Sequence, residues 1–188
     1  SLISDKKIDK NAFSWEAEFP EILSELNEEP GFDIVIGNPP YVMIEKIPKP
    51  IRKYFYDNYS IGKRFDLYQI FIENSNKLLK NSGNLGFIVP NTFLIGSSYK
   101  EFRKTILQNS KINKLVDMPQ GIFRHVTVDN IIIISTKTKI PEINHNISVI
   151  RFSPKDNPLI LLNDNSKNWF SINQKFFNDH PSYRFNIT

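Results

Sequence analysis

The chain has 188 residues, 40% of them hydrophobic and 23% charged, which is typical of one globular domain, or of one domain and the start of another. No apolar run approaches the ~20 residues of a membrane-spanning helix and no signal peptide opens the chain, so we expect a cytoplasmic protein. The absence of cysteine excludes disulfides, zinc–cysteine sites and thiol nucleophiles. A net charge of +4 is compatible with a polyanionic partner without identifying one.

A short buried strand is predicted at residues 32–37. This run, Phe-Asp-Ile-Val-Ile-Gly, is rich in β-branched residues and stops abruptly at Asn38-Pro39-Pro40-Tyr41. Before it, Pro20 suits the first turn of a short helix that continues toward Leu26. The sequence therefore places a rigid turn directly after a strand.

The next segment, residues 42–65, shows little hydrophobic periodicity and predicts an exposed loop with room for one helical turn. Asp66 then suits the N-cap of a helix whose apolar side chains share one face, and Gly83 stands where a C-terminal cap belongs. The apolar positions of that helix are Leu67, Ile70, Phe71, Leu78 and Leu79.

The rest of the chain alternates between strands and helices. Strands are predicted at residues 85–89, 112–118, 131–134 and 148–152, and helices at residues 99–107 and 168–177. Ser98 and Glu101 have the spacing of a capping box at the start of the first of these helices. This alternation is typical of the α/β class, with a parallel sheet and helices packed on its faces.

The turn at residues 38–41 is the candidate catalytic segment, because ligands of open parallel sheets bind beyond the carboxyl ends of the strands. Two successive prolines fix the backbone and remove two N–H donors, so the carbonyls of the turn are held without a local donor. Asn38 adds a side-chain carbonyl and Tyr41 a flat ring. Such a cluster suits a planar NH₂ group on an aromatic ring. Two acceptors can bind its two protons, which directs the nitrogen lone pair at an electrophile, and the ring can stack on Tyr41. The structural alternative is a stiff turn with Tyr41 packed on its own sheet.

The segment from Phe32 to Tyr41 resembles the catalytic signature of N6-adenine DNA methyltransferases of restriction–modification systems. The likeness covers roughly residues 13–137. It continues in Leu67-Tyr68, Phe71-Ile72-Glu73, Leu78-Leu79-Lys80, Gly83, Leu85 to Pro90 and Phe93-Leu94. Upstream, Phe13-Ser14-Trp15 and Glu18 to Glu21 resemble the lead-in of Eco57I-like type IIG enzymes, which join methylation and cleavage.

The resemblance implies transfer of a methyl group from S-adenosylmethionine to adenine N6 in a base flipped out of the duplex. It makes Asn38, Pro39, Pro40 and Tyr41 catalytic, and it places Asn38, Pro40 and Phe71 against the cofactor. The flipped base is expected between Tyr41 and a second ring, for which we select Phe123 in the loop before residues 131–134. As alternatives, Phe71 is a core residue and Phe123 is a hydrophobic plug at the sheet edge.

The main cofactor motif is not in this sequence. Enzymes of this kind need a glycine-rich turn and an acidic residue for the ribose, and the chain has no Gly-x-Gly. We therefore expect the cofactor-binding half upstream of residue 1, and a catalytic-domain fragment that is inactive alone. Asp33 and Asp66 are interpreted as a strand-edge residue and a helix cap rather than as ribose ligands.

Basic residues interleaved with aromatic ones in residues 42–65 predict contact with the DNA backbone. The basic residues are Lys46, Lys49, Arg52, Lys53, Lys63 and Arg64, and the aromatic ones Tyr54, Phe55, Tyr56 and Tyr59. The alternative is a solvated loop whose aromatic side chains cover the domain. His125, His145 and His180 lack metal-ligand spacing, so no metal site is expected.

The expected fold is α/β, the second half of a Rossmann-like S-adenosylmethionine methyltransferase sheet, mostly parallel with one reversed strand at residues 131–135. Residues 1–140 are expected to form the catalytic subdomain, and residues 141–188 a connection into a target-recognition region. The expected partners are double-stranded DNA and the rest of the same polypeptide. No contact with a membrane is expected. Alternative functions are methylation of RNA adenine or protein glutamine, or a catalytically silent DNA-binding module of the same fold.

Overall fold

The fold is built on a six-stranded mixed sheet with the strand order β1-β2-β4-β3-β5-β6. The computed structural model describes residues 13–62, 64–119, 121, 128–153, 156 and 169–187. The strands are β1 (Phe32–Gly37), β2 (Leu79–Pro90), β3 (Ser110–Asp117), β4 (Asn130–Lys137), β5 (Asn146–Arg151) and β6 (Phe170–Asn173). Strands β1, β2, β3 and β5 run in one direction, and β4 and β6 in the other. The predicted α/β class and reversed strand are confirmed, and β6 adds a second reversed strand.

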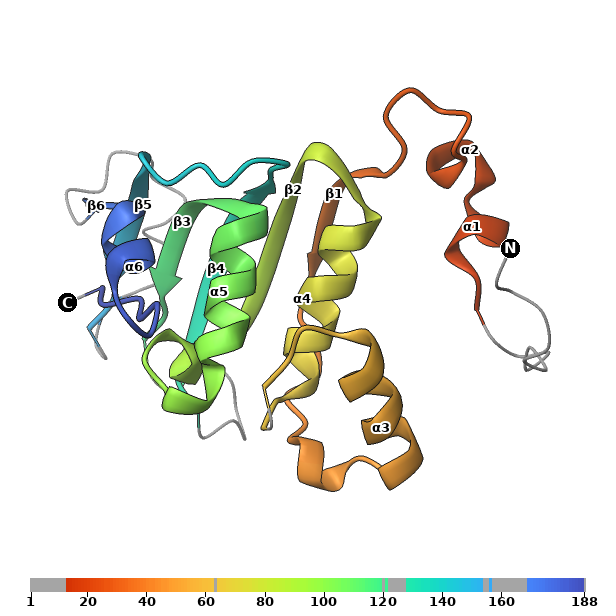
Figure 1. The fold of residues 1–188 in the computed structure, drawn as a ribbon. Coiled ribbons are helices and arrows are strands. Elements are labelled where there is room, and N and C mark those ends of the chain that lie inside the picture. Colours follow the sequence, from red (N-terminus) through yellow and green to blue (C-terminus); the bar gives the residue numbers. More distant parts are fainter. Residues whose placement is uncertain are drawn as a thin grey trace.

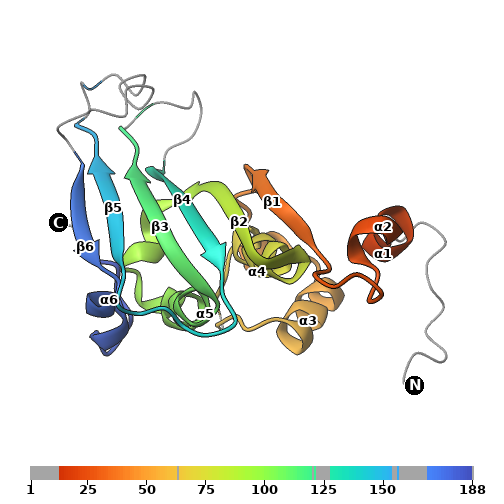
Figure 2. The same ribbon diagram turned by 90° about the horizontal axis from the view of Figure 1, so that it is seen from above.

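The main helices cover one face of this sheet (Figures 1 and 2), and α1 and α2 lie beside the free edge formed by β1. The helices are α1 (Trp15–Glu18), α2 (Pro20–Leu23), α3 (Lys49–Asn58), α4 (Leu67–Leu78), α5 (Lys100–Asn109) and α6 (Lys175–Asp179). Three 3₁₀ turns, η1 (Ile44–Lys46), η2 (Asn91–Leu94) and η3 (Ser97–Tyr99), connect them. No helix among the described residues is long and apolar enough to span a membrane.

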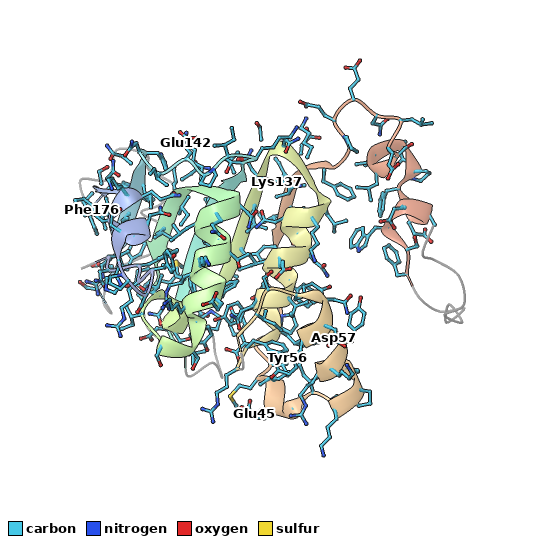
Figure 3. All side chains as sticks on the ribbon, in the orientation of Figure 1. Glu45, Tyr56, Asp57, Lys137, Glu142 and Phe176 are labelled. Carbon is cyan, nitrogen blue, oxygen red and sulfur yellow. The ribbon has the colours of Figure 1, made fainter. Side chains whose placement is uncertain are left out.

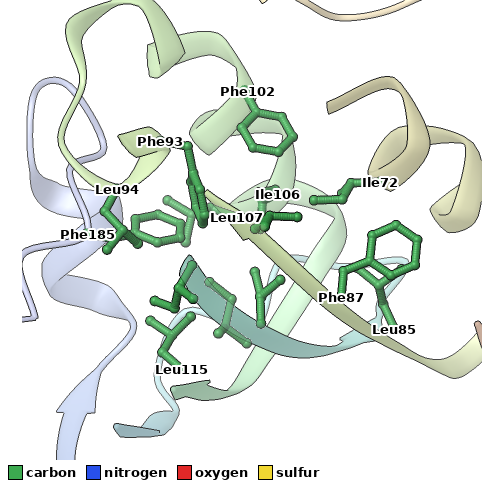
Figure 4. Close-up of a cluster of buried hydrophobic side chains, with 14 of the residues drawn as sticks. Ile72, Leu85, Phe87, Phe93, Leu94, Phe102, Ile106, Leu107, Leu115 and Phe185 are labelled. Atoms are coloured by element: carbon green, nitrogen blue, oxygen red, sulfur yellow. The ribbon is translucent and has the colours of Figure 1, made fainter. Parts of the chain in front are cut away.

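The main core lies between the sheet and helices α4, α5 and α6 (Figure 4). Because side chains alternate along a strand, every second residue of β2 and β4 points into it. Leu85, Phe87 and Ile133 are at most 4% exposed, while their neighbours Ile88 and Ile132 on the other face are only half-buried. None of the described helices packs on that other face. The register of the strands therefore decides which apolar residues form the core.

The buried guanidinium of Arg103 fixes the segment that follows β2. Arg103 is fully buried on α5 and donates hydrogen bonds to the carbonyls of Phe93 (2.6 Å), Gly96 (2.7 Å) and Ser182 (2.8 Å). Burial lowers the pKa of this guanidinium. These hydrogen bonds connect η2 and the chain near residue 182 to α5. Losing one of these acceptors would leave a buried charged donor without a partner, which is costly.

The prediction of an exposed loop at residues 42–65 is wrong. The segment contains the ten-residue helix α3 and forms a small core of its own with the start of α4. The buried residues of this core are Ile44, Ile47, Phe65 and Ile70, with Phe55 and Tyr59 packed against them. Residues 44–65 are called the α3 lobe below. The rings of Phe55 and Tyr56 lie 5.9 and 5.5 Å from that of Phe65, so they cover the lobe, as the structural alternative expected.

Two predicted caps differ in the structure. Gly83 lies inside β2 rather than after α4, because β2 begins already at Leu79, and a Cβ at Gly83 would lie 2.8 Å from the Phe32 carbonyl oxygen. The Ser98–Glu101 capping box does not form, and Tyr99 is the N-cap residue of α5.

The described tail joins the same sheet and core. The predicted helix at residues 168–177 is wrong in its first half, because residues 170–173 pair with β5 as strand β6 before α6 begins. Phe177 and Phe185 stack at 4.7 Å inside the main core. The division at residue 140, with a connection into a target-recognition region, stays a prediction.

Candidate active site

The candidate catalytic turn follows β1 at the free edge of the sheet. Strand β1 pairs with β2 in parallel up to Gly37, which lies opposite Phe87, and residues 38–41 then leave the ladder. Asn38 and Pro40 are exposed, Pro39 is buried and Tyr41 is half-buried. The turn therefore presents its asparagine at the carboxyl end of the strand, where the sequence placed it.

Tyr41 is held against the neighbouring strand rather than standing free. Its hydroxyl donates a hydrogen bond of 3.1 Å to the carbonyl of Ile88. Burial raises the pKa of this phenol, so it stays protonated and remains a donor. The residues after the turn are fixed too, since the Leu67 amide donates to the Val42 carbonyl (2.9 Å). Both contacts limit the orientations that the Tyr41 ring can adopt.

An open groove of about 610 Å³ lies beside this turn. Its volume is within the roughly 300–1,000 Å³ of small-molecule sites. The groove is lined by Trp15, Phe32, Ile34, Val35, Ile36, Gly37, Asn38, Pro39, Pro40, Phe71, Asn74, Ser75, Leu78 and Phe87. The structure thus brings together the three residues predicted to contact a cofactor, Asn38, Pro40 and Phe71.

Phe71 belongs to the groove rather than to the core. It is 45% exposed, whereas its helix neighbours Ile70 and Ile72 are at most 4% exposed. The alternative that Phe71 is a core residue is therefore wrong. Two residues of the sheet edge, Ile34 and Ile36, are 65% and 82% exposed and line the same groove. Their alternation along β1 indicates that they share one face of the strand, but the sequence alone does not show that this face is open.

No charged side chain lines the groove among the described residues. Asp33 is exposed and pairs with Lys80 at 2.5 Å. Asp66 caps α4 in a capping box with Gln69 and accepts a hydrogen bond of 2.9 Å from the Tyr99 hydroxyl. Both carboxylates have the structural roles that the sequence suggested. The groove suits an apolar ring and offers no partner for a charged group.

Five of the six basic residues predicted to contact DNA are described, and they belong to the α3 lobe, on which Figure 3 labels Glu45, Tyr56 and Asp57. Lys46, Lys49, Arg52, Lys53 and Arg64 are described, and all but the half-buried Arg52 are exposed. Lys53 pairs with Asp57 at 2.7 Å, and Arg64 lies 3.9 Å from Glu45. Lys63 and Phe123 lie outside the described residues. Their predicted roles stay predictions.

Comparison with known proteins gives one family and several partial relatives. The Eco57I restriction-modification methylase family matches residues 2–123. RM.MjaORFECS2P of Methanocaldococcus jannaschii is 35% identical over 172 residues, which are 89% of this chain and 12% of that protein. The type II restriction enzyme and methyltransferase RM.Eco57I of Escherichia coli is 36% identical over 101 residues, which are 51% of this chain and 10% of that protein. The chain therefore spans about a tenth of the length of these relatives.

Solved structures of restriction–modification proteins share the fold. The type IIG restriction endonuclease BpuSI has a TM-score of 0.59 at 15% identity, over 81% of this chain and 20% of BpuSI. The M protein of the type I restriction enzyme EcoKI has a TM-score of 0.54 at 17% identity, over 69% of this chain and 27% of that protein. At these identities the likeness supports the fold alone.

Proposed function

This chain belongs to the Eco57I restriction-modification methylase family, and from that premise we propose that it carries the catalytic turn of a site-specific DNA methyltransferase that modifies adenine N6. The observation that carries the proposal is the position of Asn38 and Tyr41. Both lie at the carboxyl end of an edge strand, and Asn38 borders an apolar groove of cofactor size. A DNA substrate implies a cytoplasmic enzyme.

In this proposal Asn38 and the turn carbonyls bind the reacting amine. The Asn38 side-chain oxygen accepts one proton of the adenine NH₂ group and a turn carbonyl accepts the other, which turns the nitrogen lone pair toward the methyl donor. Adenine's amine conjugates into its ring and is a poor nucleophile, so this orientation lowers the barrier. Tyr41 supplies a face on which the base stacks. The proton leaves after transfer, so the turn needs no strong base.

The groove fits one part of S-adenosylmethionine, which supplies an electrophilic methyl group when bound. The ring of Phe71 and the apolar side chains of β1 suit the cofactor's adenine. Because no charged residue lies in the described lining, the charged amino-acid end of the cofactor needs partners from elsewhere. We expect a glycine-rich segment of the same polypeptide to supply them. A solved structure described as a class I S-adenosylmethionine-dependent methyltransferase from Listeria monocytogenes shares this fold with a TM-score of 0.52 at 20% identity, which supports the assignment.

The DNA path is expected to run from the turn across the α3 lobe. The exposed basic residues of the lobe suit phosphate groups. Strand β3 ends at Asp117 and β4 begins at Asn130, at the same end of the strands as the turn after β1. The connection between them contains Phe123, the predicted second ring for the flipped base. This topology supports a two-sided clamp with Tyr41.

The test is methyl transfer by the complete natural polypeptide. With tritiated S-adenosylmethionine and duplex DNA, we expect N6-methyladenine in the digested product. Asn38→Ala should abolish transfer and leave DNA binding within a few-fold, because phosphate contacts supply most of the affinity. Asn144→Ala is the matched control, since Asn144 is also exposed but lies far from the turn in the connection before β5.

Other outcomes would point to the alternatives. Transfer to RNA or to a glutamine-containing protein, with none to DNA, would replace the proposed substrate. Tight DNA binding without any transfer would support the silent module. Transfer within a few-fold of the wild type in Asn38→Ala would show that Asn38 is structural.

A further inference from the structure

One buried tyrosine has no role in the proposed chemistry but lies against the proposed base platform. Tyr68, the second residue of α4, is fully buried. Its ring lies edge-on to that of Tyr41, with 6.5 Å between the centroids and 82° between the planes. We propose that Tyr68 is a positioning residue that holds Tyr41 in the plane on which the target adenine stacks. This inference rests on the proposed function.

The contact can set the plane of the Tyr41 ring because it is the third of three contacts that hold this residue. The hydroxyl of Tyr41 is bonded to Ile88 at one end of the ring. At the other end, the backbone after Tyr41 is bonded to the start of α4 through Val42 and Leu67. These contacts leave rotation about the ring axis, which an edge-to-face neighbour restrains because the positive ring edge prefers the negative ring face.

Tyr68 is itself rigid. Its ring meets Phe102 of α5 at 5.9 Å and 77°, and Phe102 meets Phe93 of η2 at 5.6 Å and 78°. Both phenylalanines are at most 3% exposed. A series of edge-to-face aromatic contacts therefore connects Tyr41 to the main core. A platform supported in this way needs no ordering when the base arrives.

Removing the hydroxyl of Tyr68 distinguishes a positioning role of its ring from a polar role of its hydroxyl. This hydroxyl is buried near Tyr99 and Thr92 but makes no hydrogen bond of normal geometry with any described residue. Burial raises its pKa well above the ordinary value, so it stays neutral. Removing a buried hydroxyl without a partner is close to neutral for stability. Tyr68→Phe therefore keeps the ring contact with Tyr41 and removes only the hydroxyl.

The experiment measures methyl transfer by the complete polypeptide under saturating DNA and S-adenosylmethionine. Tyr68→Leu should lower kcat about three- to tenfold, the range expected for one lost aromatic contact. Tyr68→Phe should restore kcat to within twofold of the wild type. KM for S-adenosylmethionine should not change in either variant. Phe177→Leu is the control for core damage, because Phe177 is as deeply buried but contacts the far end of the core at Phe185.

A double-mutant cycle with Tyr41→Ala identifies the route of the effect. If Tyr68 acts through Tyr41, then Tyr68→Leu should cost no further activity once the Tyr41 ring is gone. Additive losses, or an equal loss in Phe177→Leu, would overturn the proposal. If Tyr68→Leu does not fold, Tyr68→Met replaces it, because the flexible thioether fills irregular gaps. Should the wild type transfer no methyl group, the proposed function fails. Should an active, Asn38-dependent enzyme tolerate Tyr68→Leu, only this inference fails.

Discussion

The helix-covered face of the sheet and the β1 edge of its other face carry the same kinds of residue in opposite environments. On the helix-covered face, Leu85 and Ile133 are at most 2% exposed. On the other face, at the β1 edge, Ile34 and Ile36 are 65% and 82% exposed. The difference comes from register, because β1 places Val35 toward the helices and its two isoleucines away from them. Hydrophobic character alone therefore does not locate the core of this protein.

The exposed apolar residues at the β1 edge are contiguous rather than scattered. Ile34, Ile36 and Phe71 line one groove together with Asn38. Contiguous exposed apolar surface usually marks a ligand or interaction site. The comparison thus divides the molecule into a covered face that stabilises the fold and an open edge that serves the proposed chemistry. The predictions below test that division.

The largest expected effect separates the two faces directly. Ile133→Ala should lower the free energy of unfolding by about 2–5 kcal/mol, because it leaves a cavity in the main core. Ile36→Ala should change it by no more than about 0.5 kcal/mol, because the side chain is already in water. Urea unfolding of the 188-residue chain measures both. Similar losses in the two variants would show that Ile36 is covered in solution and would contradict the division.

Phe123 tests whether the open edge extends to the second side of the flipped base. If its ring stacks on adenine, Phe123→Ala should weaken DNA binding by the complete polypeptide by about 1–3 kcal/mol, roughly ten- to a hundredfold. A mismatch at the target should recover part of the loss, since a mismatched base costs less to flip. Binding to duplexes that carry 2-aminopurine at the target gives affinity and flipping together.

A thermal melt of the same variant provides the contrast. As a plug at the sheet edge, Phe123 would behave like a core residue, and alanine would cost about 3–5 kcal/mol of stability. Phe123→Trp would then be harmful through overpacking, whereas a stacking site should accept the larger ring. A destabilised Phe123→Ala variant that flips the base normally would remove Phe123 from the site.

Strands β1 to β5 and the turn at residues 38–41 could be predicted from the sequence because their signals are local. A β-branched run ended by glycine and two prolines indicates both the end of β1 and the start of the turn. Register is not local, so the exposure of Ile36 and Phe71 required the pairing of β1 with β2. The same limit applies to Gly83, whose place in β2 depends on the close approach of Phe32.

The errors at α3 and β6 have different causes. Phe55 of α3 and its C-cap residue Tyr59 have the i, i+4 spacing of a helix face, but Pro48, Pro50 and the many charges obscure it. The prolines are tolerated because Pro48 is the N-cap and Pro50 lies in the first turn. At β6, pairing with β5 overrides the local preference of residues 170–173. Tertiary context therefore explains the error at β6, whereas at α3 a signal in the sequence was missed.

Asp66 lies at the boundary between the covered face and the α3 lobe. Asp66→Ala should cost about 1 kcal/mol, because it removes the capping oxygen of α4. Asp66→Asn should cost less, since asparagine caps equally well and carries no buried charge. Unfolding at pH 7 ranks the variants.

The pH dependence of the Asp66 variants gives a second test. Burial is the main cause that raises the pKa of the Asp66 carboxyl, opposed by the Tyr99 hydroxyl. The folded state therefore holds this proton more tightly than the unfolded state, and the resulting stabilisation is lost as pH rises through the folded pKa. Relative to the wild type, Asp66→Asn should gain stability as pH rises above the ordinary carboxyl pKa of 3.8 and through the raised pKa of the folded state. A constant difference would contradict the assigned cause.

The smallest effect concerns two exposed lysines of the α3 lobe, of which one is paired with a carboxylate and the other is not. Lys49 makes no ion pair with any described residue, whereas Lys53 is held by Asp57 at 2.7 Å. If the lobe follows the DNA backbone, Lys49→Ala should weaken binding of all duplexes a few-fold and reduce the slope of log K against log salt by about 0.9. Lys53→Ala should change that slope less, because Asp57 already neutralises its charge. Neither variant should alter stability by more than about 0.5 kcal/mol, since exposed ion pairs contribute little. Binding titrations at several salt concentrations measure both slopes, and an unchanged slope in Lys49→Ala would remove α3 from the DNA path.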